Sequence, residues 1–203
     1  MKCTSSIVML LGALLYIPVA DPAPAPVSDP AAAPVHALTA ALLTSMHAGA
    51  GLSMAERYRS LAPVVKRVFA LPLVTRLAVG PDWASFSADQ RAALLAGFTR
   101  FTIANYAYNF RDFDGQKFAI DDNLLTYGED KVVRTQLLPA HDTPVSLLYR
   151  MREVGGTWKI IDVYSDGVSS LALRRTDFAE ALAAGGAAAL IAYLNEASDA
   201  LMR

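Results

Sequence analysis

The hydrophobic pattern changes its period after Gly115, from helical to strand spacing, and this change sets the fold class. Before it, apolar residues recur at helical spacing, and the longest such run extends roughly from Ala88 to Phe110. After it come segments of strand length rich in Val, Ile, Leu and aromatic residues: Lys117–Asp122, Lys131–Pro139, Val145–Val154 and Thr157–Tyr164. Helices, then strands, then helices predict an α+β fold, with a small antiparallel sheet of about four strands covered by helices.

Cap and turn residues place several boundaries of these elements. Gly155-Gly156 predicts a two-residue hairpin turn, so the last two strands are antiparallel neighbours. Ser87 with Gln90, and Ser53 with Glu56, form capping-box patterns at the starts of two helices. An amphipathic helix over 35–51 is expected to precede them.

Prolines predict breaks in the helical first half. Pro63 and Pro72 are expected to split the stretch up to Val79 into short helices, because proline is tolerated in a first turn but not deep inside a helix. Gly80-Pro81-Asp82 marks a further break before the long helix.

After the strands, the pattern becomes helical again. Ser170 or Thr176 is expected to cap a helix that runs through Ala184. Gly185-Gly186 should interrupt it, and apolar residues at helical spacing then predict a last helix over 187–201.

The N-terminus has the features of an export signal. Lys2 precedes the apolar run Ile7–Ile17, and Pro18 and small residues follow, with cleavage expected after Ala20. The run is shorter than the roughly 20 apolar residues of a membrane span, so a membrane anchor is the less favoured alternative. Residues 21–34 hold five of the eleven prolines, which favours an extended spacer. We expect a signal peptide at 1–20, an Ala/Pro-rich linker at 21–34 and a single domain at 35–203.

Composition narrows the classes of partner. With 54% hydrophobic and 18% charged residues, a chain of 203 residues is too apolar to be disordered overall and long enough for one core. A net charge of −1 gives no basic footprint for nucleic acid. The single cysteine, Cys3, would leave with the signal peptide, so the mature chain would have no disulfide and no thiolate nucleophile.

The sequence shows little that points to catalysis. His36 and His47 would lie on nearly the same helix face but about 16 Å apart, too far to share one metal ion. His141-Asp142 lies between two prolines, a context typical of a solvated turn rather than of a general base. There is no Gly-x-Ser-x-Gly elbow, phosphate loop or His-Glu-x-x-His motif. We therefore expect no enzyme, no catalytic residue, no metal and no cofactor, although a sequence cannot exclude spatially paired carboxylates.

Large apolar side chains are abundant in both the helical and the strand segments. Each one taken alone is more often part of a packed core than of a binding site. A helical layer over one face of a small curved sheet can nevertheless leave a slot, and ligand pockets are lined mainly by apolar groups. The set therefore indicates an internal apolar cavity.

Several motifs, in this order, resemble one known family. They are the helix from Gln90 to Ala107 with its aromatic spacing, then Trp158–Val163, Asp166–Ser169, Arg175–Phe178 and Gly185-Gly186. Together they resemble the MlaC-type (toluene-tolerance) periplasmic lipid-binding components of ABC transport systems, over roughly two thirds of the chain. The likeness is greatest to the hopanoid-biosynthesis-associated HpnM subgroup.

The resemblance implies a periplasmic carrier without catalytic groups. It would bind phospholipid or a hopanoid-like lipid in an apolar cavity and shuttle it to membrane-bound lipid-transfer partners of the outer-membrane transport system. Arg174 stands where the broader family tends to have Tyr, and Ser165 replaces a usually apolar residue. These departures concern the ligand more than the fold. Because headgroups need no burial, we expect loose headgroup selectivity.

The expected cavity residues lie on the predicted inward faces of the long helix and the strands. They are Phe98, Phe101, Tyr106, Val133, Leu147, Tyr149, Met151, Ile160 and Tyr164. Two alternatives stay open: an enzyme on a cone-shaped α+β fold that uses His141 or an aspartate as base, and a non-binding scaffold of a membrane complex. Co-purified lipid, or its absence, separates these alternatives from the carrier.

Overall fold

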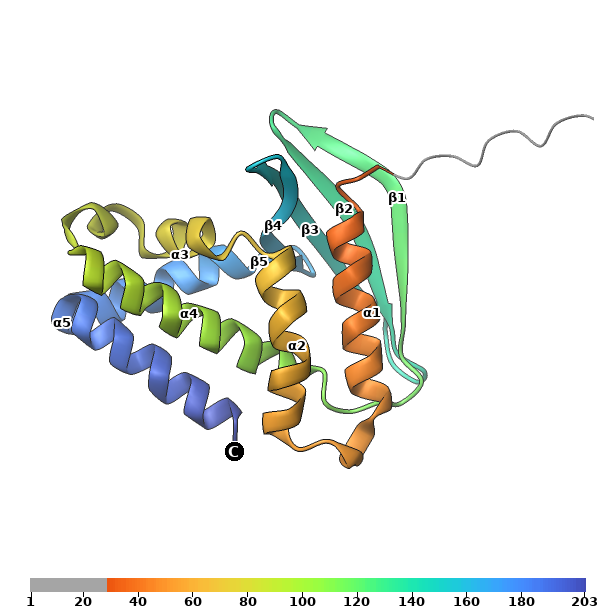
Figure 1. The fold of residues 1–203 in the computed structure, drawn as a ribbon. Helices are drawn as coiled ribbons and strands as arrows, with labels where there is room; N and C mark the ends of the chain where they lie inside the picture. The colour runs from red at the N-terminus through yellow and green to blue at the C-terminus, as the bar shows by residue number, and fades with distance from the viewer. Residues whose placement is uncertain (1–28) are drawn as a thin grey trace, which may run out of the picture.

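The structure, a computed structural model, describes residues 29–203 (Figure 1). The predicted signal peptide and the first part of the predicted linker lie outside the described residues. The helices are α1 (Ala33–His47), α2 (Met54–Val68), α3 (Leu71–Val79), α4 (Ala88–Asn109) and α5 (Ser170–Leu201), with short 3-10 turns at Gly49–Gly51 and Gly80–Ser85. The strands are β1 (Lys117–Tyr127), β2 (Asp130–Leu138), β3 (Val145–Val154), β4 (Thr157–Ser165) and β5 (Val168–Ser169).

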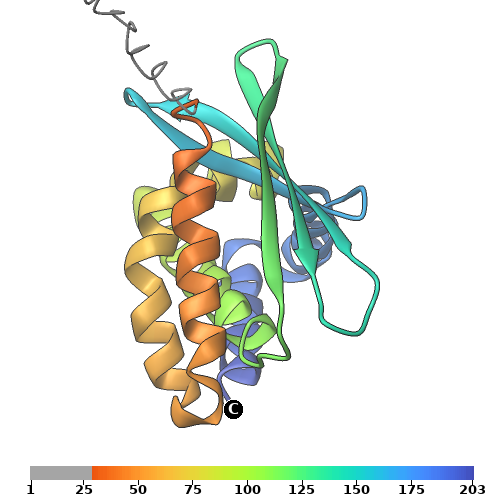
Figure 2. The same ribbon diagram turned by 90° about the vertical axis from the view of Figure 1, so that its right-hand side faces the viewer.

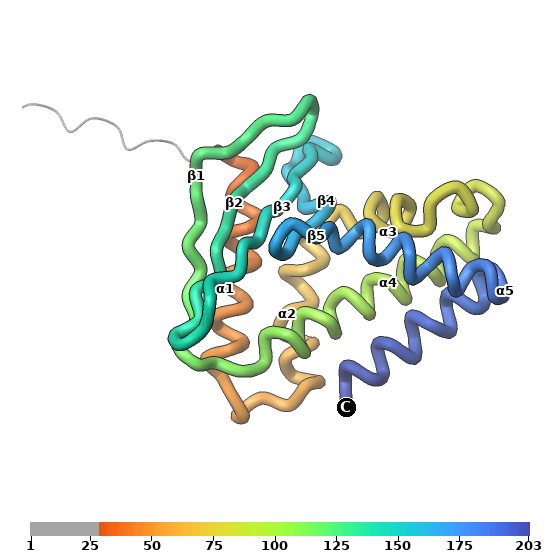
Figure 3. The backbone as a smooth tube through the Cα atoms, turned by 180° about the vertical axis from the view of Figure 1, so that it is seen from behind, coloured from red at the N-terminus to blue at the C-terminus, as the bar shows by residue number. Residues whose placement is uncertain are grey.

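The five strands form one antiparallel sheet in the order β1-β2-β3-β4-β5, which confirms the predicted α+β class. The helices α1 and α2 stand beside the sheet, whereas α4 and the two halves of α5 extend away from it (Figures 1 and 2). Seen from behind, α5 leaves the sheet next to β5, runs outward and turns back on itself (Figure 3). The outer helices, α3, α4 and α5, therefore meet the sheet mainly where β4 and β5 lead into α5.

Both predicted capping boxes are present. The Ser53 amide donates to the Glu56 carboxylate at 2.9 Å, and the Ser87 amide donates to the Gln90 side-chain oxygen at 2.9 Å. Each serine hydroxyl in turn accepts from the third amide of its helix, so the first turns of α2 and α4 have reciprocal caps. These caps fix where α2 and α4 begin.

Pro63 does not break its helix, and this prediction was wrong. It lies well inside α2, which continues to Val68, whereas Pro72 lies in the first turn of α3 as expected. Proline removes the hydrogen bond to the carbonyl four residues earlier, here that of Arg59. Both Pro63 and Arg59 are exposed, so water can satisfy that carbonyl and the helix tolerates the loss.

The strand predictions hold with shifted ends. β3 has the predicted bounds, and the turn at Gly155-Gly156 has positive φ at both glycines, +59° and +75°, as a tight hairpin requires. β1 runs five residues past Asp122, with an irregular register between Asp121 and Leu125. The short strand β5, which was not predicted, adds a fifth strand beside β4.

The helix α5 begins and bends at glycine and serine positions. Its N-cap is Ser169, whose hydroxyl accepts from the Ala172 amide at 3.0 Å, rather than Ser170 or Thr176. The predicted interruption is confirmed, because Gly185 and Gly186 have non-helical backbone angles. By length and composition α5 could span a membrane. However, the helix bends at these two glycines, and its buried residues, including Phe178 and Leu190, belong to the core.

The folded unit starts earlier than the sequence indicated. Ala31 and Ala32, assigned to the linker, are fully buried. The Asp29 carboxylate accepts from the Lys131 ammonium of β2 at 2.5 Å, and this ammonium also lies 4.9 Å from the centre of the Trp158 ring. Residues 29–34 are therefore packed against the sheet.

Asp130 ties β2 to β3 through a partly buried ion cluster. Arg152 donates to both of its oxygens, at 2.6 and 2.8 Å, and Arg150 donates to Oδ2 at 2.6 Å. Burial alone would raise the pKa of Asp130, but the hydrogen bonds and charges of the two arginines outweigh burial and hold this pKa below its usual value. Asp130 is therefore more stable as the carboxylate in the folded chain than in the unfolded one.

We predict that Asp130→Asn lowers the free energy of unfolding at pH 7 by about 1–3 kcal/mol, because it leaves two arginines without their shared carboxylate. Since the folded pKa is depressed, the contribution is present above about pH 4, the unfolded value, and is lost as pH falls through the lower folded value. Urea unfolding of both proteins at pH 7 and pH 3 checks this. A difference that stays the same at both pH values would contradict it.

Candidate functional site

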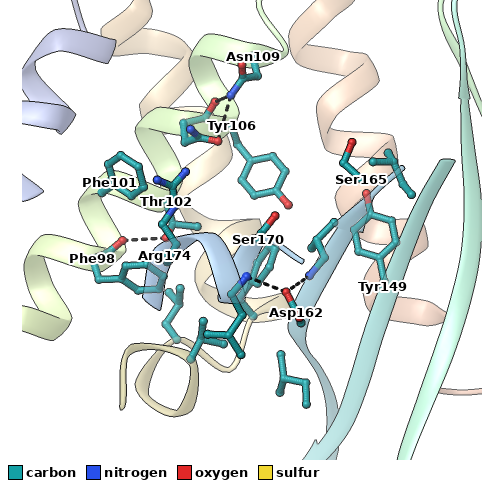
Figure 4. A pocket seen from close by; sticks show the side chains of 18 of the residues that line it. Phe98, Phe101, Thr102, Tyr106, Asn109, Tyr149, Asp162, Ser165, Ser170 and Arg174 are labelled. Atoms are coloured by element: carbon teal, nitrogen blue, oxygen red, sulfur yellow. Dashed lines mark hydrogen bonds between the residues drawn. The ribbon is translucent and has the colours of Figure 1, made fainter. Parts of the chain in front are cut away.

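A half-open cavity of about 280 Å³ lies between the outer helices and the sheet (Figure 4). Its walls come from α3, α4, β3, β4 and the first turns of α5. This size is near the lower end of the range of about 300–1,000 Å³ for small-molecule pockets. The cavity is the site at which a ligand of this chain would be enclosed.

The inner end of the cavity is apolar and closed. Its wall there consists of buried side chains from the α2–α3 junction, α3, α4 and the sheet: Phe69, Leu71, Val74, Phe98, Phe101, Leu147 and Ile161. No polar side chain among them can hydrogen-bond to a ligand, so this end favours hydrocarbon over water.

The other end of the cavity is polar and open. Among its lining residues, Asn109, Ser165 and Ser170 are exposed, which places the mouth between the end of α4 and the turn from β4 into α5. Thr102 and Asn105 lie next to Asn109 along the same helix face. An amphipathic ligand therefore finds an apolar end and a polar end in one cavity.

The spacing of residues along α4 produces this division. Phe98, Phe101 and Tyr106 contribute aromatic rings, and Thr102, Asn105 and Asn109 follow a parallel row at i, i+3 and i+7. Both rows face the cavity because α4 packs on α2 and α5 with its other sides. One helix thus supplies both the apolar and the polar wall.

Asp162 fixes the wall where β4 meets α5. Its Oδ1 accepts from the backbone amides of Val163 and Leu171, at 2.8 and 2.9 Å, and its Oδ2 accepts from the Ser169 hydroxyl at 2.6 Å (Figure 4 shows the two amide bonds). Ser169 caps α5 with the same hydroxyl. Both side chains thus bond to nearby backbone amides, and Gly167, in the turn between β4 and β5, has a positive φ of +85°.

Two tyrosine hydroxyls reach the middle of the cavity (Figure 4). Burial raises the pKa of Tyr106 well above its ordinary value, and the neighbouring Tyr149 raises it further. Burial also raises the pKa of Tyr149. Within residues 29–203 neither hydroxyl has a hydrogen-bond partner, so both are neutral donors available to a ligand. The cavity thus has polar groups without negative charge at mid-depth.

The structure brings five of the nine predicted cavity residues together on the wall: Phe98, Phe101, Tyr106, Leu147 and Tyr149. Val133, Met151 and Ile160 are fully buried in the packed core and do not line the cavity. Tyr164 is half-buried on the opposite face of the sheet, since it pairs with Leu148 rather than with an inward residue.

A β-bulge explains the misplacement of Tyr164. Tyr149 pairs with Val163, but Met151 pairs with Ile160, so Ile161 is an extra residue in β4. After an extra residue the alternation of inward and outward side chains is reversed, so simple alternation fails. Val163 therefore lines the cavity in place of Tyr164, whereas Ile160 shares the inward face with Met151 and lies in the packed core.

The contribution of α3 to the cavity wall was not predicted from the sequence. Phe69, Leu71 and Val74 form part of the closed end, and this depends on how α3 docks against α4 and α5. Local pattern carries no signal for that docking. Asn105 and Phe110, by contrast, follow the helical spacing of α4 and could have been included from that spacing alone.

Comparison with known proteins identifies the family. The family model described as MlaC protein matches residues 36–196, most of the chain. The chain belongs to the MlaC family. The family-level resemblance seen in the sequence motifs is thereby confirmed.

A solved structure shares the MlaC fold of this chain. The phospholipid-binding protein from Ralstonia solanacearum, in complex with a phospholipid, matches with a TM-score of 0.74 at 21% identity, over 85% of this chain and 99% of that one. At this identity the likeness shows the fold. A search of curated proteins found no match.

We predict that Asp162→Asn lowers the free energy of unfolding by about 1–3 kcal/mol, because an amide cannot accept all three hydrogen bonds of the carboxylate. Hydrogen exchange of the Leu171 amide should also become faster. Glu180→Gln, an acid-to-amide change at an exposed position of α5, is the matched control and should change stability by less than about 0.5 kcal/mol. Equal effects of the two changes in urea unfolding would contradict the role given to Asp162.

Proposed function

We propose that this protein is a periplasmic carrier that binds the tails of phospholipid or a hopanoid-like lipid in the cavity and shuttles them between membrane-bound transport partners. The observation that carries the proposal is the cavity itself, which is apolar and closed at one end, and polar and open at the other. This arrangement matches a molecule with a hydrocarbon tail and a polar head.

Energetics explain why such a carrier needs a dry cavity and no chemistry. Burial contributes about 0.8 kcal/mol per CH₂, so a chain of about sixteen carbons left in water would cost on the order of 12 kcal/mol. Aromatic and aliphatic walls such as those of Phe98, Phe101 and Leu147 offset that cost for the part of the chain they enclose. Transfer then requires that the lipid leaves one apolar environment for another.

The comparisons support the part of the proposal that concerns lipid binding and transport. Membership in the MlaC family supports lipid binding and transport in the periplasm, and the Ralstonia solanacearum relative in fold is a phospholipid complex. Export by residues 1–20, the membrane-bound partners and a hopanoid-like ligand rest on the sequence and its resemblance to HpnM. Ser165 and Arg174, where the sequence departs from the broader family pattern, both line the cavity.

The enzyme alternative has weaker support in the described residues. His141 is exposed in the loop between β2 and β3 and does not line the cavity. Asp162, the acidic residue of the cavity wall, already accepts three hydrogen bonds. The scaffold alternative does not need an open cavity with an apolar end.

Solvent extraction of the purified protein, followed by mass spectrometry, tests the proposed function. The carrier should release lipid in an amount approaching one molecule per chain. Protein that carries no lipid, and takes up none from vesicles of bacterial phospholipid, would contradict the proposal and favour the scaffold.

We predict that Leu147→Asp abolishes lipid retention while circular dichroism still shows a folded chain, because a carboxylate on the apolar wall would be desolvated by the acyl chain. Leu148→Asp is the matched control. Leu148 is the next residue in β3, faces the other side of the sheet and does not line this cavity, so lipid should be retained. Lipid retained by Leu147→Asp would overturn the assignment of the site.

A further inference from the structure

The wall of the cavity contains one basic side chain, Arg174. Among the described residues that line the cavity, Arg174 is the single cation and Asp162 the single anion. Asp162 is used by its three internal hydrogen bonds and by the cap of α5. Any charge that the cavity offers to a ligand therefore comes from Arg174.

The Arg174 guanidinium is held in place but has spare donors. Its Cζ lies 4.6 Å from the centre of the Phe101 ring, and its Nη1 donates to the Asp177 carboxylate at 2.9 Å. Within residues 29–203 this is its one hydrogen bond, whereas a guanidinium has five N–H donors. The side chain is 27% exposed, so it is positioned by protein and still reachable from the mouth.

Uncharged hydrogen-bond donors also line this cavity. The Asn105 amide oxygen accepts from Asn109 at 3.0 Å, which leaves the Asn105 NH₂ group free within the described part of the chain. The Ser170 hydroxyl likewise has no protein partner among the described residues, and both groups line the cavity with Arg174. Figure 4 shows Arg174 next to α4, near Phe98, Phe101 and Thr102. Hydrogen-bond donors from two helices thus line one cavity.

We propose that Arg174 is a specificity-determining residue that binds the anionic headgroup of the lipid, a phosphate diester or a carboxylate, with Asn105 and Ser170 as neutral donors. A guanidinium matches the two oxygens of either anion in a bidentate contact. This inference rests on the proposed function, since it concerns the head of a lipid whose tail lies in the cavity. It replaces the expectation of loose headgroup selectivity with a preference for anionic heads over uncharged ones.

Asp177 sets the strength of this preference. In the structure it is the acceptor that an incoming anion must compete with. Removal of its charge should free Arg174, and removal of the Arg174 charge should abolish the preference. Two variants with effects of opposite sign therefore separate headgroup binding from a merely structural ion pair, which both changes would weaken in the same direction.

The experiment is lipid uptake from vesicles that contain equal amounts of phosphatidylglycerol and diacylglycerol with the same acyl chains, and palmitic acid as a third component. Mass spectrometry of the re-isolated protein gives the ratio of bound charged lipid to bound diacylglycerol. The original chain should prefer a charged lipid over diacylglycerol, and Arg174→Gln should lower that ratio about tenfold, the size expected for one charged hydrogen-bonded contact. Asp177→Asn should raise the ratio. Preference for phosphatidylglycerol or for palmitic acid identifies the anion.

Arg175→Gln is the matched control, because Arg175 is the next residue, is exposed and does not line the cavity. Its lipid ratio should equal that of the original chain. An original chain without preference, or an Arg174→Gln variant that keeps it, would overturn the proposal while total lipid uptake still supports the carrier. An original chain that takes up no lipid would instead contradict the proposed function itself. If Arg174→Gln does not fold, Asp177→Asn alone decides. A ratio of charged lipid to diacylglycerol below that of the original chain then overturns the inference.

Discussion

The carboxylate of Asp162 joins the sheet to the outer helices, and the shape of the molecule depends on this joint. After β4 the chain must reverse and begin α5 within a few residues, and Asp162 holds this turn by accepting from the Leu171 amide and the Ser169 hydroxyl. The first half of α5 therefore leaves the sheet in a defined direction, with α3 and α4 packed on it. The sheet and the outer helices meet along the edge formed by β4 and β5. Next to this edge they are separated, and the cavity lies between them.

The cavity changes in character from its closed end to its mouth, and this gradient follows from the sequence of α4. The rings of Phe98 and Phe101 face the closed end, Tyr106 adds a neutral hydroxyl at mid-depth, and Asn109 reaches the solvent. An amphipathic lipid has the same order of parts.

Features encoded by local pattern were predictable, and features that depend on docking were not. The capping boxes, the glycine hairpin turn and the break at Gly185-Gly186 follow from the needs of single turns, and all are present. The aromatic row of α4 was also found, because helical spacing fixes a face. The bulge at Ile161 and the docking of α3 arise from tertiary packing, so Tyr164 was placed on the wrong face of the sheet and Leu71 was missed.

The most direct test of the account is an NMR measurement on the protein loaded with a lipid whose acyl chains are ¹³C-labelled. Nuclear Overhauser effects from the chain methylenes should reach the ring protons of Phe98 and Phe101, which lie at the closed end of the cavity. Contacts to exposed apolar residues such as Val168 and Leu173, with none to those two rings, would show that the lipid lies on the surface and would contradict the account.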